Sequence, residues 1–158
     1  MDLASSFDLD EYEHILSLFP RLRDEPHALR SPATRRYNCI AFAGGDDVQR
    51  WSPERFCYWP RRLDRTHSLR SYRALFAIEG YADCESRELV PGIEKIALYV
   101  VAGSDEVLHA ARQRDDGVWL SKLGDLADIE HASLESLEGD GEQYGRVALI
   151  MSRKRSLG

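Results

Sequence analysis

The sequence predicts an α+β fold in which helices come first along the chain and an antiparallel sheet follows. Three observations support it: apolar residues repeat at helical spacing in the first half, extended runs follow in the second, and Asp116-Gly117 provides a hairpin turn between two of those runs. The length of 158 residues suits one core. We expect a single domain over residues 1–158, with an N-terminal helix and wrap (1–36) before the core (37–152).

The chain is expected to begin with one amphipathic helix. Asp8 with Glu11 resembles a capping box, and apolar residues then repeat at helical spacing until Pro20. This pattern predicts a helix over residues 9–19. Three prolines among charged residues favour an ordered loop over residues 20–36.

Two more helices are expected before the sheet. Asn38 is a good N-cap and Gly44-Gly45 a good stop, so the apolar run between them predicts a short helix with Cys39 in its first turn. Leucine and aromatic residues at helical spacing predict a further helix from about Ser68 to Glu79.

The second half predicts a meander of strands. Its extended apolar runs are separated by turn residues, as in antiparallel sheets. The expected elements are strands at Lys95–Ala102, Glu106–Gln113, Val118–Leu123 and Arg146–Met151, a helical turn at Ser133–Leu137 and a solvated tail at Arg153-Lys154-Arg155.

Charge is unevenly distributed along the chain. There are 27 acidic and 21 basic residues, and residues 80–158 hold 15 of the acidic and 9 of the basic ones. Residues 50–73 instead hold seven arginines interleaved with aromatic side chains, a pattern that suits phosphate contacts and base stacking. Because a net charge of −6 disfavours polyanions, nucleic acid is not the expected partner, and a solvated arginine surface is the simpler interpretation.

The sequence also bears on compartment and cofactors. No run approaches the roughly 18 apolar residues of a membrane span, and the acidic start lacks the pattern of a secretory signal. Three cysteines without tight spacing suit a reducing compartment, so we expect a cytoplasmic protein with no membrane partner. No cofactor is expected, and no metal either, because no cysteine or histidine spacing matches a ligand pair. Export by a dedicated secretion machine and the oligomeric state stay open.

Cys39 is the candidate nucleophile. At a helix start, unpaired backbone N–H groups and the positive end of the dipole stabilise a thiolate. Cys57 lies in an aromatic loop and Cys84 beside carboxylates, so both are expected to be packing or incidental thiols. The alternative for Cys39 is a small buried core residue.

His109 is the candidate general base. It falls in the middle of an expected strand, where burial is costly unless both ring nitrogens are satisfied. Facing Cys39, it would accept the thiol proton and later donate it to a leaving group. Asp125 or His131 would orient the imidazole, and Asp128 lies in the same segment. The alternatives are a satisfied core histidine and an acidic solvated loop.

These segments resemble the papain-like superfamily of thiol hydrolases, and within it the compact NlpC-type peptidases and amidases. Tyr37-Asn38-Cys39-Ile40-Ala41 is similar to the entry of the nucleophile helix. His109-Ala110 and Trp119-Leu120-Ser121-Lys122 are similar to the His-Ala and Trp-x-x-Lys strands. The Tyr-Asn-Cys-Ile-Ala, His-Ala-Ala-Arg-Gln and Trp-x-Ser-Lys-Leu-Gly segments also resemble a bacterial domain family for which we know no established substrate. The resemblance implies a compact papain-like fold whose cysteine-bearing helix packs on the antiparallel sheet.

Two departures from the papain-like pattern stand out. Leu123 occupies the position at which papain-like proteases carry asparagine, and no glutamine upstream of Cys39 supplies an oxyanion hole. The Cys39 backbone N–H with Tyr37 or Asn38 is the expected substitute. Lys122 and Trp119 would then face the substrate.

Two function classes follow. The leading hypothesis is a cysteine peptidase, amidase or acyltransferase that acts on a peptide, amide or acyl group, free or carried on a protein. The alternative is a non-catalytic interaction module, such as a toxin, its partner or an accessory domain, that keeps the fold without turnover.

Overall fold

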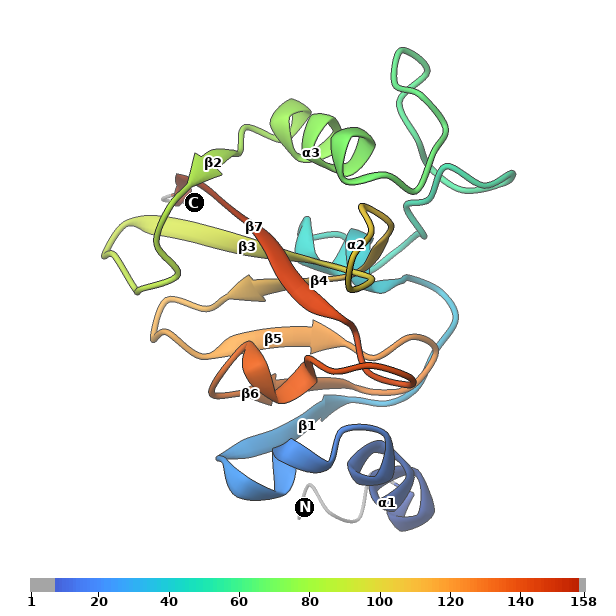
Figure 1. Ribbon diagram of the computed structural model, residues 1–158, viewed down its shortest axis with the longest axis vertical. Coiled ribbons are helices and arrows are strands. Elements are labelled where there is room, and N and C mark those ends of the chain that lie inside the picture. The colour runs from blue at the N-terminus through green and yellow to red at the C-terminus, as the bar shows by residue number, and fades with distance from the viewer. Residues whose placement is uncertain (1–7, 157–158) are drawn as a thin grey trace.

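A seven-stranded antiparallel sheet forms the centre of the computed structural model, which describes residues 8–156 (Figure 1). The strands lie in the order β1-β6-β5-β4-β3-β7-β2. The predicted α+β class with an antiparallel sheet is therefore confirmed. In chain order the strands are β1 (His27–Ser31), β2 (Ala82–Cys84), β3 (Ile93–Val100), β4 (Val107–Gln113), β5 (Trp119–Lys122), β6 (Asp128–His131) and β7 (Arg146–Lys154).

The predicted helices lie where capping residues place them. They are α1 (Leu9–Leu18), α2 (Cys39–Ala43) and α3 (Leu69–Ile78), and their N-caps Asp8, Asn38 and Ser68 each accept a hydrogen bond from a backbone N–H of the first turn. The prediction of a capping box at α1 is wrong, because Glu11 Oε1 accepts a hydrogen bond from the Ala127 N–H, at 3.0 Å, instead of one from the start of its own helix. Two 3-10 helices, η2 (Pro20–Asp24) and η3 (Glu135–Leu137), complete the described chain.

Three strands, β1, β2 and β6, were not expected from the sequence. β1 interrupts the segment expected to be a loop. Pro26 and Pro32 flank it rather than lie within it, and in the described sheet β1 is an edge strand that pairs only with β6. β6 was expected to be an acidic loop, but its Asp128 is neutralised by Arg30 of β1 at 2.7 Å. Arg153 lies in β7 rather than in a solvated tail, because Glu94 of β3 pairs with it at 2.5 Å.

The two faces of the sheet bury separate hydrophobic clusters. Successive side chains of a strand point to opposite faces. On β3, Ile96 and Leu98 belong to the cluster under α2 and α3, called here the α2 face, whereas Ala97 and Tyr99 belong to the cluster under α1, η2 and η3, called here the α1 face. The parity of a position therefore decides which helices its side chain can meet.

Helix α2 packs against β4 and β5 and is followed by a tight turn. Gly44 ends the helix where a Cβ would lie 2.4 Å from the Trp51 ring, and Gly45 has a φ of +90° that favours glycine. Both glycines of the expected stop are thus required by the geometry. Among residues 8–156, no helix has the length and apolar character needed to cross a membrane.

Candidate functional site

Cys39 opens α2, as the sequence predicts, but its surroundings disfavour a thiolate. Its side chain packs against the cluster of the α2 face. Burial raises the pKa of the thiol, and hydrogen bonds with the backbone of Ala110 and Ile40 together with the charge of Arg50 only partly offset this. The pKa of Cys39 therefore lies above its ordinary value, the reverse of what a helix-start nucleophile needs.

His109 lies on the opposite face of the sheet from Cys39. Ala110 belongs to the cluster against which Cys39 packs, so its neighbour His109 points to the α1 face. There the imidazole stacks on Tyr144 at 4.1 Å between ring centroids with an interplanar angle of 4°. The residue is 0% exposed. The structure does not bring the expected nucleophile and base together, because Ala110 occupies the position that faces Cys39.

His109 is instead joined to His131 through Ser121. Ser121 Oγ lies 2.9 Å from His109 Nε2 and 2.8 Å from His131 Nε2, and His131 Nδ1 lies 2.8 Å from the Ser133 carbonyl oxygen. Burial lowers the pKa of His109 well below its ordinary value and that of His131 to about 4. Two neutral imidazoles around a buried hydroxyl form a core network. It corresponds to the core histidine that the sequence left as the alternative, except that His109 Nδ1 is buried without a hydrogen-bond partner within residues 8–156.

Trp119 lies beside this network rather than beside Cys39. It pairs with His131 across β5 and β6 and is buried in the cluster of the α1 face. Asp125, the other expected orienting group, is exposed and pairs with Arg35 at 3.3 Å and Arg50 at 3.4 Å. Asp125 thus joins neither histidine.

Lys122 is committed to the backbone. It is 0% exposed, and its Nζ donates to the carbonyl oxygens of Thr34 at 2.9 Å, Gly124 at 3.0 Å and Leu126. The ammonium also lies 5.3 Å from the centre of the Tyr37 ring. Lys122 therefore holds loops together and has no donor left for a substrate. The side-chain amide of Asn38 is likewise occupied. Its Nδ2 donates to the Trp51 carbonyl oxygen, and its Oδ1 accepts from the backbone N–H groups of Ala41 and Trp51.

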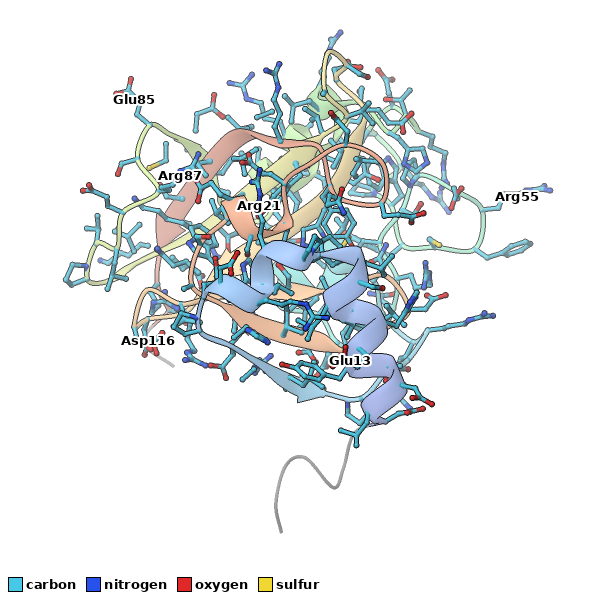
Figure 2. All side chains as sticks on the ribbon, turned by 60° about the horizontal axis from the view of Figure 1, so that its bottom comes forward. Glu13, Arg21, Arg55, Glu85, Arg87 and Asp116 are labelled. Atoms are coloured by element: carbon cyan, nitrogen blue, oxygen red, sulfur yellow. The ribbon has the colours of Figure 1, made fainter. Side chains whose placement is uncertain are left out.

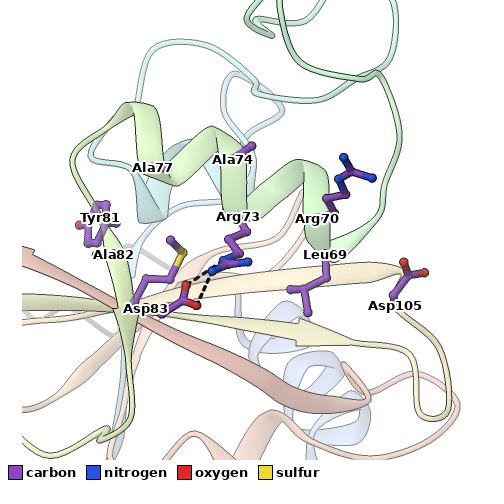
Figure 3. Close-up of a pocket in the computed structure, with 10 residues that line it drawn as sticks. Leu69, Arg70, Arg73, Ala74, Ala77, Tyr81, Ala82, Asp83 and Asp105 are labelled. Carbon is purple, nitrogen blue, oxygen red and sulfur yellow. Dashed lines mark hydrogen bonds and ion pairs between the residues drawn. The ribbon is translucent and has the colours of Figure 1, made fainter.

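A broad groove lies between α3 and strands β2 and β7 (Figure 3). Its volume is about 960 Å³, and the Arg73–Asp83 ion pair at 2.7 Å lies within it. Apolar residues such as Leu69, Ala77 and Met151 make up most of its walls. None of the site residues expected from the sequence lines it.

A second, polar pocket of about 170 Å³ lies on the α2 face beside α2. Arg30 of β1, Arg112 of β4 and Asp128 of β6 line it together with Tyr37 and the turn after α2. The sequence did not reveal this pocket, although Arg112 stands in the His-Ala-Ala-Arg-Gln segment and Asp128 lies in the segment expected to supply the orienting group. Within residues 8–156, the polar pocket included, no group of three or more histidine, cysteine or acidic side chains could hold a metal ion.

Cys84 is expected to react faster than Cys39, the reverse of the order that the sequence predicts. Burial acts to raise the pKa of Cys84, but hydrogen bonds with Ser86 and Ser152 and the charge of Lys95 outweigh it, so this pKa is lowered. Alkylation by iodoacetamide at pH 7.5, read by peptide mass spectrometry, should therefore modify Cys84 several-fold faster than Cys39. Faster modification of Cys39 would contradict the placement of its thiol.

The comparisons with known proteins give a family but no activity. The family model described as "Domain of unknown function (DUF7689)" matches residues 28–152, and the chain therefore belongs to this family. No curated protein and no solved structure matches the chain significantly.

Proposed function

We propose that this member of the DUF7689 family is a non-catalytic interaction module that keeps a papain-like arrangement, a cysteine-bearing helix packed on an antiparallel sheet. The separation of Cys39 and His109 by the sheet supports this proposal. A shift of one residue along a strand moves a side chain to the other face, so the histidine stands one position away from a productive location. With Ala110 opposite the thiol, His109 does not face Cys39 to take its proton.

The interacting element is the arginine loop, defined here as residues 50–65. It lies in the connection from α2 to α3 and projects from the body of the molecule, as Figure 1 shows, and Figure 2 places Arg55 at its outer end. Phe56 next to it is fully exposed, at 101%. An exposed phenylalanine costs solvation free energy in the isolated protein, and a partner that covers it would recover that cost.

Phe56 is also held in a strained conformation. Its φ is +67°, the single positive value among the non-glycine residues that the structure describes. This region costs a side-chain-bearing residue roughly 1–2 kcal/mol. Such strain persists where the surrounding structure enforces it, and it gathers at functional positions.

Contacts at the base of the arginine loop hold the loop in this conformation. Trp51 and Trp59 are each 5% exposed and belong to the cluster of the α2 face. The Tyr58 N–H donates to the Arg50 carbonyl oxygen at 2.9 Å, and Arg65 Nη1 donates to the Pro53 carbonyl oxygen at 3.0 Å. The loop is therefore a pre-formed surface, which reduces the entropy lost on binding.

Charge indicates the chemistry of the partner. The arginine loop holds five arginines against Glu54 and Asp64 in a chain of net charge −6. A complementary partner is a protein with an acidic surface around an apolar pocket that receives Phe56. The cytoplasmic location expected from the sequence would place such a partner in the same compartment.

A capture experiment with matched variants tests the proposal. Immobilised wild-type chain and the Cys39→Ala variant should capture the same protein from an extract of the source cells, whereas Phe56→Ser and the triple variant Arg55→Glu, Arg61→Glu, Arg62→Glu should lose it. Leu9→Ser is the control, because Leu9 is 69% exposed on α1, away from the loop (Figure 1).

Two results would reject the interaction module. One is capture that survives in Phe56→Ser and in the triple variant. The other is acylation of Cys39 by an activated-ester or acyl-amide probe with turnover that Cys39→Ala abolishes, which would restore the hydrolase hypothesis.

A further inference from the structure

The polar pocket beside α2 contains an arginine with no partner. Arg112 stacks on Phe42 with its guanidinium 4.7 Å from the ring centre, and no hydrogen bond or ion pair within residues 8–156 holds it. Burial and the charge of Arg30 lower the pKa of Arg112. A partly buried guanidinium with no directly paired carboxylate within the described chain would be stabilised by an anionic group.

The other charges of the pocket are accounted for, with one exception. Arg30 pairs with the buried Asp128 at 2.7 Å. Asp46 accepts four hydrogen bonds from the turn, two from backbone N–H groups, one from the Gln49 side chain and one from the Trp51 indole. Asp47 alone among the carboxylates has no hydrogen bond or ion pair within the described chain, and it is exposed at the rim. One uncommitted cation and one uncommitted anion therefore share the pocket.

We propose that this pocket binds a small zwitterion of the α-amino acid class, with Arg112 taking the carboxylate and Asp47 the ammonium group. A simple anion would meet the carboxylate of Asp47, and a simple cation would meet Arg112, so a ligand with both charges fits best. The hydroxyls of Tyr37 and Ser31 line the same space.

Size and shape agree with a ligand of this class. The volume of about 170 Å³ equals the space of about five or six water molecules at roughly 30 Å³ each, enough for a small amino acid. Gly45 lines the pocket close to Arg112, since a Cβ there would lie 3.9 Å from Arg112 Nη1. Asp128 Oδ1 is buried and lacks a hydrogen-bond partner in the described chain, which leaves an acceptor in the pocket wall without a donor. No residue of the arginine loop lines the pocket, so the proposal does not depend on the interaction module.

Nuclear magnetic resonance titration of the full chain with L-alanine tests the proposal. Alanine should shift the amide signals of Gly45 and Asp47 in a saturable way, and acetate and methylammonium, which each carry one of the two charges, should bind at least ten-fold more weakly. Arg112→Gln and Asp47→Asn should each weaken alanine binding about ten-fold, the effect of losing one charge-assisted contact. Arg114→Gln, one residue beyond the end of β4, is the matched control, because Arg114 pairs with Asp116 at 2.8 Å and does not line the pocket.

Asp47 is exposed, so its substitution leaves the fold intact and keeps the test decisive even where Arg112→Gln fails to fold. The proposal is wrong if no signal saturates by about 50 mM alanine, a very weak affinity. Equal binding of acetate and alanine, tighter binding of inorganic phosphate, or alanine affinity unchanged in Asp47→Asn would each overturn it as well.

Discussion

The Lys122→Met variant should be about 3 kcal/mol less stable than the wild-type chain. Methionine fills a similar volume but donates nothing, so the carbonyl oxygens of Thr34, Gly124 and Leu126 lose the ammonium that they share. Each hydrogen bond from a charged donor contributes about 1.5–3 kcal/mol, and part of the total is returned because water can reach the partly exposed carbonyl oxygens and a buried charge is no longer desolvated. Urea unfolding followed by tryptophan fluorescence measures the difference.

Lys95→Met is the matched control for this variant. Lys95 is also buried, at 2% exposure, but its Nζ donates to one carbonyl oxygen, that of Ser86, at 2.6 Å. Its loss should cost about 1 kcal/mol. Equal destabilisation by the two substitutions would show that Lys122 contributes through its hydrocarbon stem rather than through its three acceptors.

Acid should destabilise the chain through its two buried histidines. Above pH 6.5 both are neutral in the folded and the unfolded protein and contribute nothing to the pH dependence. Below that pH the unfolded chain takes up protons, but the folded chain does not, because burial lowers the pKa of His131 to about 4 and that of His109 well below its ordinary value. Stability is therefore lost as the pH falls from about 6.5, by about 1.4 kcal/mol per pH unit for each histidine.

The His131→Gln variant isolates this effect. Glutamine is uncharged at every pH, so the stability that the chain loses between pH 7 and pH 5 should be about 2 kcal/mol smaller than in the wild type. Comparing each protein with itself at two pH values removes any constant cost of the altered hydrogen bonds to Ser121 and Ser133. An identical pH dependence in the two proteins would mean that His131 takes up its proton in the folded state.

Local signals predicted much of the fold. Asn38 and Gly44-Gly45 bounded α2 correctly because caps and stops act within one helical turn. The β1 and β6 strands escaped prediction because their stability comes from each other, through a pairing of segments about a hundred residues apart and the Arg30–Asp128 contact between them. Periodicity within one segment carries no information about such a partner.

The candidate site shows the same division. The sequence correctly placed Cys39 at a helix start and His109 within a strand. It could not determine the face to which His109 points, because this depends on the register of β4 against α2, and a change of one residue reverses it. The polar pocket was missed since its residues come from β1, α2, β4 and β6, which only the folded chain brings together.

The pH dependence of Cys39 alkylation tests the central claim, that Cys39 and His109 do not form a pair, most directly. In a chain with Cys57→Ser and Cys84→Ser, the iodoacetamide rate of Cys39 should rise through one titration above the ordinary thiol value of about 8.5. The curve should keep its midpoint when His109→Gln is added. A rate that already reaches a plateau below pH 7, and a plateau that His109→Gln removes, would instead establish a thiolate–imidazolium pair and contradict the account.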